Sequence, residues 1–95
     1  MICAAVTIHV HPGKADAYEA MCRELLPKVR ANEPGILFFD IGKCVGRPDT
    51  FKVIEIYRDT QASADHHETE YFKAARPVMT ECIASIEVET YDSLA

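Results

Sequence analysis

The chain opens with a strict alternation of side chains. Between residues 2 and 11 the even positions are apolar and form one face, while the odd positions form the other face. A period of two is typical of a β-strand, so we predict a strand over residues 2–11. The pair Pro12-Gly13 then ends this strand.

A second apolar pattern follows with the spacing of a helix. Apolar side chains recur at intervals of three and four residues and form one stripe: Tyr18, Met21, Cys22, Leu25 and Val29. We therefore predict an amphipathic helix over about residues 15–32. Pro27 lies inside it, and because proline has no amide N–H, we expect the helix to kink or break there.

Three further strands are predicted in the second half of the chain. Residues 36–45 and 51–57 are apolar on both faces, apart from Glu55, and the sequence GRPD between them is a turn. Residues 85–91 alternate between apolar and acidic side chains and predict the last strand.

Two helical pieces are predicted between the third and fourth strands. Asp59 or Thr60 can cap a short helix that runs to about His67, because either side chain can accept a hydrogen bond from a free amide group. Thr69 can cap a second piece that is apolar on one side. Pro77 lies in this second piece, where we again expect a kink.

The resulting order, βαββαβ, is that of an α+β ferredoxin-like domain with an antiparallel sheet. Right-handed crossovers place the first and third strands in the centre and all helices on one face. The second and third strands are apolar on the uncovered face too, so that face has to be buried. A second copy packed sheet against sheet would bury it. We predict one domain over residues 1–95 that forms a homodimer.

Composition narrows the range of partners and compartments. The net charge is −5, and such a surface repels nucleic acid and anionic membranes. No apolar run approaches the roughly 20 residues of a membrane helix. The apolar N-terminus has no basic leader, so we do not interpret it as a signal peptide. The four cysteines are scattered, which favours reduced, buried thiols and a cytoplasmic location.

Histidines and acidic groups gather in residues 63–75, SADHHETEYFKAA. Neighbouring residues of a helix point about 100° apart, so His66 and His67 would not converge on one ion. No HExxH or other ligand spacing is present, and we expect no metal site. His9 and His11 share one strand face, where we expect a partly exposed strand end.

Glu55 is a carboxylate in the middle of an apolar strand. Such a group has to be paired, hydrogen-bonded or raised in pKa, and a raised pKa could serve proton transfer. Structural pairing with a lysine or arginine across the dimer is the alternative. Asp40 raises the same question on the second strand. No glycine-rich nucleotide loop or nucleophile motif occurs, so we expect no nucleotide or flavin cofactor.

Several short motifs in this order resemble the antibiotic biosynthesis monooxygenase (ABM) domain family over nearly the whole chain. They are PGK after the first strand, EPG before the second, FKVIEIYRD on the third, and HHETEYF in the helical region. His66 and Phe72 stand where the family has a histidine six residues before an aromatic residue. Glu55 matches its frequent strand glutamate, while Tyr71 stands where the family often has histidine.

The resemblance implies a dimeric α+β barrel and several activities. Members include cofactor-free monooxygenases of phenols or quinols, haem-degrading enzymes and a branch that resembles a sugar-phosphate isomerase. The haem-degrading branch uses an Asn, a Trp and a helical His. This chain has no Trp, and Val6 and Arg76 stand at the other two positions. We therefore expect no haem chemistry and no cofactor.

We interpret the chain as a cofactor-free monooxygenase of a small aromatic or quinol substrate. His66 would be the base, and Glu55 would tune or orient it. The candidate substrate-binding residues are Phe38, Phe39, Tyr57, Tyr71, Phe72 and Arg76. Of those on strands, only the residues on one face of the sheet can line the pocket at the same time. The alternatives are an isomerase of a small carbonyl metabolite, including a phosphorylated one, and a non-catalytic ligand-binding dimer. Arg76 and Lys73 beside the pocket would favour the isomerase, and an apolar pocket the oxygenase.

Overall fold

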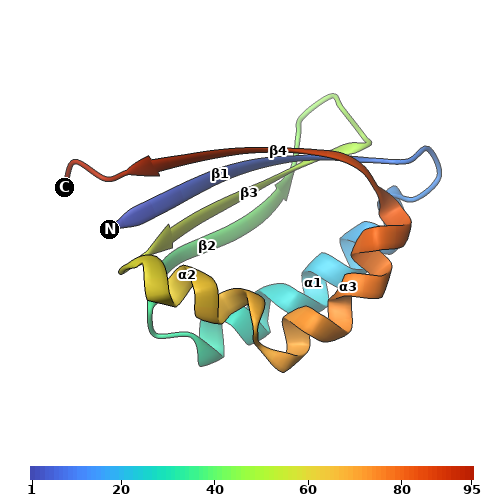
Figure 1. The fold of residues 1–95 in the computed structure, drawn as a ribbon. Helices are drawn as coiled ribbons and strands as arrows, with labels where there is room; N and C mark the ends of the chain where they lie inside the picture. The colour runs from blue at the N-terminus through green and yellow to red at the C-terminus, as the bar shows by residue number, and fades with distance from the viewer.

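The computed structural model describes residues 1–95, and its elements follow the predicted order (Figure 1). They are β1 (Ile2–Val10), α1 (Ala15–Asn32), β2 (Ile36–Lys43), β3 (Thr50–Tyr57), α2 (Thr60–His67), α3 (Glu70–Cys82) and β4 (Ile83–Asp92). The strands form one antiparallel sheet in the order β2-β3-β1-β4. The ferredoxin-like fold and the central places of β1 and β3 are thereby confirmed. No helix is long and apolar enough to cross a membrane.

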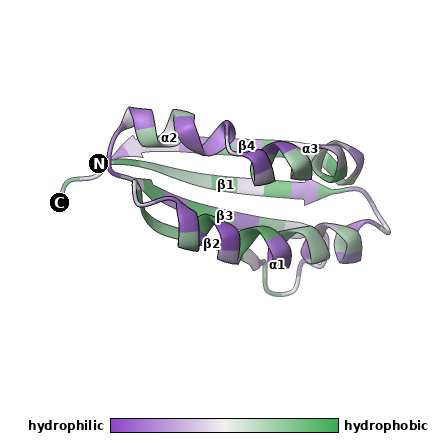
Figure 2. Cartoon of the chain, turned by 90° about the horizontal axis from the view of Figure 1, so that it is seen from below, coloured by the Kyte–Doolittle hydropathy of each residue, from purple (hydrophilic) through white to green (hydrophobic).

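All three helices lie on one side of the sheet (Figure 1). Seen from that side, α1 lies in front of β2 and β3, and the α2–α3 run lies in front of β4 (Figure 2). Strand register assigns the side chains to faces, because directly paired residues of antiparallel strands point the same way. Ala4 pairs with Glu55, and Glu55 pairs with Phe39. This row faces the helices.

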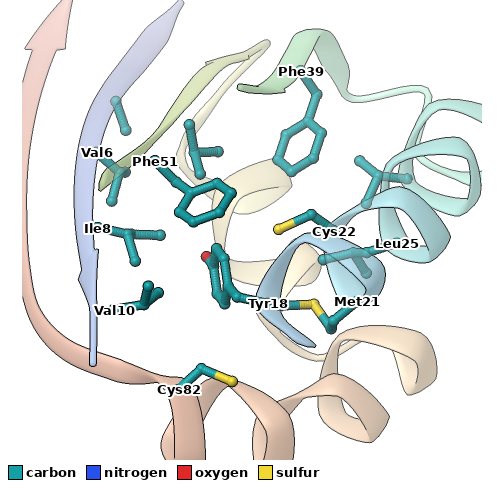
Figure 3. Close-up of a cluster of buried hydrophobic side chains, with 13 residues drawn as sticks. Val6, Ile8, Val10, Tyr18, Met21, Cys22, Leu25, Phe39, Phe51 and Cys82 are labelled. Atoms are coloured by element: carbon teal, nitrogen blue, oxygen red, sulfur yellow. The ribbon is translucent and has the colours of Figure 1, made fainter. Parts of the chain in front are cut away.

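The helical stripe predicted for α1 forms one side of the core. All five of its members are buried: Tyr18, Met21, Cys22, Leu25 and Val29. Opposite them, Val6 and Ile8 of β1 and Phe51 of β3 point from the sheet toward α1 (Figure 3). The rings of Tyr18 and Phe51 meet edge to face at 4.8 Å between centroids. Burying each such side chain stabilises the fold by about 1.5–3 kcal/mol.

Both predicted helix caps form. The Asp59 carboxylate accepts a hydrogen bond from the Ala62 amide at 2.9 Å, and Thr69 Oγ1 accepts one from the Phe72 amide at 3.4 Å. Thr69 also donates its hydroxyl hydrogen to the carbonyl of His66 at 2.9 Å. The two caps therefore fix the starts of α2 and α3, and Thr69 also holds the turn that follows His66.

Of the kink or break expected at Pro27, the break does not occur. Helix α1 runs without interruption from Ala15 to Asn32 and includes Pro27, and α3 likewise includes Pro77. Both prolines lie on exposed positions of their helices. The carbonyl group that loses its amide donor can therefore bond water, while the buried stripe holds the helix in place.

The uncovered face of the sheet carries an apolar row at one end. Phe38, Ile56, Cys3 and Tyr91 lie across it in register. Phe38 and Tyr91 are 47% and 49% exposed, so both ends of this row are accessible to solvent in the single chain, whereas Cys3 between them is buried. Asp40 and Lys52 also lie on this face. The prediction that β2 and β3 are apolar on both faces therefore holds only at this end of the sheet.

The four cysteines form no disulfide. Cys3, Cys22 and Cys82 are buried free thiols, as predicted, and Cys44 is half-buried. Burial raises the pKa of the Cys22 thiol to about 11. This thiol therefore behaves as a small apolar core residue.

Candidate functional site

A cavity of about 290 Å³ lies between the covered face of the sheet and the helices. Twenty residues line it, and fifteen of them are hydrophobic. The five others are Glu55, Ser63, His66, His67 and Thr90. Small-molecule sites typically combine such an apolar wall with a few polar groups. The cavity contains both residues that the sequence singled out for chemistry, His66 and Glu55.

His66 stands in the last turn of α2, and its side chain is 1% exposed. Three aromatic rings surround it, those of Phe39 at 5.4 Å, Tyr57 at 6.1 Å and Phe72 at 5.0 Å between ring centroids. The residue is thus a buried member of the cavity wall. His67, by contrast, is exposed, and its Nδ1 lies 2.9 Å from the carbonyl oxygen of Ser63.

The partner of His66 is Glu33, which sequence reasoning missed. His66 Nδ1 lies 3.0 Å and 3.1 Å from the two carboxylate oxygens of Glu33. Tyr71 donates its hydroxyl hydrogen to Glu33 Oε2. Because an ionised carboxylate only accepts hydrogen bonds, Nδ1 carries the imidazole proton. Nε2 has no hydrogen-bond partner within the chain and remains for a ligand.

Glu33 could have been found from the EPG motif. It follows the last turn of α1 and precedes Pro34, which places it at the entrance to β2. Its side chain is only 10% exposed and has no lysine or arginine partner, although six other acidic side chains pair with lysine or arginine. Charged side chains are rarely buried unless they are paired, so a buried glutamate at a helix end is unusual. The motif alone did not indicate which side chain it would meet.

Glu55 occupies the same cavity from the sheet side. Burial raises the pKa of Glu55, and the electrostatic effect of the nearby His66 partly opposes that rise. No lysine or arginine pairs with Glu55, and its side chain faces the helices. The alternative of a structural ion pair across a sheet-to-sheet dimer therefore does not fit its orientation.

The candidate wall residues divide between the two faces of the sheet. Phe39 and Phe72 line the cavity, whereas Phe38 points to the uncovered face. Tyr57 packs behind His66, and its buried hydroxyl group has no hydrogen-bond partner. Burial and the neighbouring Glu55 carboxylate both raise the pKa of Tyr57. Tyr71 contributes to the Glu33 cluster instead of the cavity wall.

The basic candidates remain outside the cavity. Arg76 donates a hydrogen bond from Nη2 to the carbonyl of His67 at 3.0 Å, and its guanidinium carbon lies 5.5 Å above the centre of the Phe72 ring. Lys73 lies 3.7 Å from the carboxylates of Glu68 and Glu70. Arg76 therefore braces the helical turn from outside, and no cationic side chain of Lys or Arg lines the cavity.

The arrangement offers a base without a metal. No three His, Cys, Asp or Glu side chains are grouped so that they could hold a metal ion. His9 Nε2 lies 3.3 Å from the Glu87 carboxylate on the uncovered face, far along the sheet from His66. The cavity can thus bind a flat apolar molecule and present it to one imidazole and one carboxyl group.

Comparison with known proteins agrees with this geometry. The sequence pattern of the antibiotic biosynthesis monooxygenase family matches residues 1–78. No curated protein matches the chain. A candidate antibiotic biosynthesis monooxygenase from Caulobacter crescentus CB15 is 34% identical, with a TM-score of 0.91 over 99% of this chain and 90% of that one.

Other solved structures agree with this match. PA3566 from Pseudomonas aeruginosa is 28% identical, with a TM-score of 0.91 over 99% of this chain and 94% of that one. A candidate antibiotic biosynthesis monooxygenase from Nitrosomonas europaea is 26% identical, with a TM-score of 0.89 over the full length of both chains. The chain belongs to the antibiotic biosynthesis monooxygenase family.

Proposed function

We propose that this protein is a cofactor-free monooxygenase of a small hydroxylated aromatic or quinol, with His66 as its base. The observation that carries this proposal is the cavity between sheet and helices, which is apolar except for a few groups that include His66 and Glu55. A volume of about 290 Å³ suits a molecule of one or two fused rings.

The free Nε2 of His66 accepts the proton of a substrate hydroxyl group and leaves an electron-rich anion. This anion reduces oxygen, a carbon–oxygen bond forms, and the O–O bond then breaks as a proton returns and water leaves. For a quinol the balance is one quinol and one O₂ to one hydroxyquinone and one water. The apolar walls hold the anion in position.

Glu55 has a supporting role in this proposal. Its raised pKa favours the neutral acid, which can donate a hydrogen bond to a substrate or peroxide oxygen. Phe39 and Phe72 offer flat apolar contacts beside His66. Glu55, Phe39 and Phe72 would orient the substrate ring, while His66 would remove its proton.

The isomerase alternative is less well supported. A phosphorylated substrate would need cationic partners, and Arg76 and Lys73 lie outside the cavity and are engaged with groups of the helical region. The lining of the cavity includes no Lys or Arg. This favours the apolar, oxygen-dependent chemistry over recognition of a phosphate group.

Oxygen uptake is the direct test. Purified protein is offered naphthoquinols and dihydroxylated aromatics in a chelator-treated buffer without flavin, and uptake above the rate of autoxidation is recorded. With ¹⁸O₂ we expect one labelled atom in the organic product and one in water. Uptake that yields only hydrogen peroxide would indicate an oxidase instead. No uptake with any such substrate would remove the proposal and favour the isomerase or a binding protein.

A further inference from the structure

We propose that Glu33 forms a proton relay with His66, which carries the substrate proton out of the cavity to a polar cleft on the surface. This inference rests on the proposed function only in making His66 the proton acceptor. It concerns a residue that has so far been described only as the partner of His66.

The relay is inferred from two separate pockets, the cavity and a surface cleft, that are joined by the contact between His66 and Glu33. The second pocket is a surface cleft of about 440 Å³, mostly polar, at the ends of α1 and α2. Its lining includes Glu33 together with Asn32, Arg58, Gln61, Asp65 and Thr69. His66 lines the cavity and not the cleft, and Glu33 lines the cleft and not the cavity. Their contact at 3.0 Å therefore joins the cavity to the cleft.

Each step of the transfer has a defined donor and acceptor. The substrate O–H bond breaks as an N–H bond forms at His66 Nε2. The Nδ1–H bond then breaks as an O–H bond forms on the Glu33 carboxylate, and that proton passes to water in the cleft. The reverse transfer returns one proton when water is formed, so the relay is unchanged after a full cycle.

The surroundings of Glu33 are suited to this role. Tyr71 holds Oε2 by a hydrogen bond, and no lysine or arginine neutralises the carboxylate. Arg58, the one basic side chain in the cleft, donates instead to the carbonyl of Pro34 at 3.0 Å. A carboxylate without a permanent counter-ion can accept a proton more readily than one held by a guanidinium group.

Other titratable groups also face the pair. From β3 they are Glu55 and Tyr57, from α2 His67, and from α3 Tyr71. Neither tyrosine titrates in the working range, because burial first, together with the nearby carboxylates, raises the pKa of Tyr71 to about 12 and that of Tyr57 further. Glu55 and His67 are on the cavity side, so neither offers a path to the cleft.

The first test uses isosteric variants and a probe that needs no oxygen chemistry. Glu33→Gln keeps an acceptor oxygen for the Nδ1–H group but cannot take up its proton, whereas Glu33→Asp keeps the carboxylate. Under nitrogen, 4-nitrophenol is mixed with each protein in weak buffer, and phenolate absorbance and a pH-indicator dye are followed by stopped flow. We expect Glu33→Gln to slow proton release at least 10-fold and up to about 10²-fold, and Glu33→Asp to recover much of the rate.

Two controls separate a relay from a structural role. Glu24→Gln makes the same chemical change on an exposed part of α1, where Glu24 lies 3.7 Å from Lys28 only, and should leave proton release unchanged. Formate or acetate should speed release in Glu33→Ala in proportion to its concentration, because a small acid can enter the cleft. Equal rates in wild type and Glu33→Gln, or a bound probe that stays protonated, would overturn the relay.

A ligand-free measurement completes the test. The ¹⁵N shifts of the His66 imidazole in the neutral form should identify the tautomer with its proton on Nδ1, and an Nε2–H tautomer would overturn the relay even if the probe does not bind. If the tautomer and proton release behave as expected but no quinol consumes oxygen, the relay stands and the monooxygenase proposal fails.

Discussion

A histidine can act as a base when one nitrogen is held with its proton and the other is free. At the residue scale, Glu33 and Tyr71 provide the first condition and the cavity provides the second. His66 and His67 are adjacent in sequence, yet one is 1% exposed and the other lies at the surface. Their different environments make them a matched pair for mutation.

We expect His66→Ala to lower the rate of substrate turnover by about 10²–10⁴-fold, because the only base with a free nitrogen in the buried part of the cavity is lost. His67→Ala should have a much smaller effect, since His67 is exposed to solvent whereas His66 is 1% exposed in the cavity wall. Oxygen uptake with the same quinol measures both, after circular dichroism has established that both variants are folded. Equal rates in the two variants would exclude His66 from the mechanism.

Glu55 predicts a pH dependence of stability. Burial raises the pKa of Glu55 above that of the unfolded chain. Between these two values the folded protein binds more protons than the unfolded one, so the free energy of unfolding falls as pH rises. Glu55→Gln removes this titration. Urea unfolding from about pH 4 to pH 8 should show the variant gaining stability relative to wild type as pH rises, and a constant difference would contradict the assignment.

At the scale of single elements, helix α1 tolerates a residue that helices normally exclude. Its apolar stripe is buried along its whole length, from Tyr18 to Val29. Each buried side chain contributes about 1.5–3 kcal/mol, and together they outweigh the cost of about 3 kcal/mol that proline imposes within a helix. Packing, not intrinsic propensity, maintains the helix at Pro27.

It follows that Pro27→Ala should stabilise the protein. The variant regains one backbone hydrogen bond, while the unfolded chain gains some freedom, so we expect the free energy of unfolding to rise by about 1–2 kcal/mol. Pro48→Ala, in the turn between β2 and β3, is the control and should cost about 0.4–1 kcal/mol. Urea titrations monitored by circular dichroism measure both. A loss of stability in Pro27→Ala would mean that its ring makes contacts that alanine cannot replace.

At the scale of the whole molecule, the sheet has one face under helices and one face without cover (Figure 1). The uncovered row of Phe38, Ile56, Cys3 and Tyr91 is a continuous apolar strip. A chain of 95 residues buries a smaller share of its surface by itself than a larger domain does. We propose that residues 1–95 act as one domain in a homodimer, in which two such faces pack together.

Sedimentation at micromolar concentration should give about twice the chain mass of 10.6 kDa. Phe38→Asp should shift the protein to the monomer, because it places a charge in the apolar row that the dimer would bury. Val45→Asp makes a similar change in a loop, where Val45 is 100% exposed, and should leave the mass unchanged. A wild-type protein that sediments as a monomer would contradict the dimer.

The sequence by itself determined what depends on near neighbours. Period two indicated β1 and β4, runs that are apolar on both faces indicated β2 and β3, and a helical stripe indicated α1. The capping residues Asp59 and Thr69 indicated where α2 and α3 begin. These features depend on interactions between residues a few positions apart, which the order of the chain already contains. The divergence of His66 and His67 followed in the same way, from the rotation between successive residues of a helix.

Only the tertiary structure decided what depends on packing between elements. Phe39 faces the cavity and Phe38 does not, because the register of β2 on β3 puts Phe39 beside Glu55. Glu33 and His66 are 33 residues apart in the chain and meet only because the end of α1 lies against α2. Such contacts arise from how whole faces fit together, and no local pattern along the chain encodes which distant side chain each will meet.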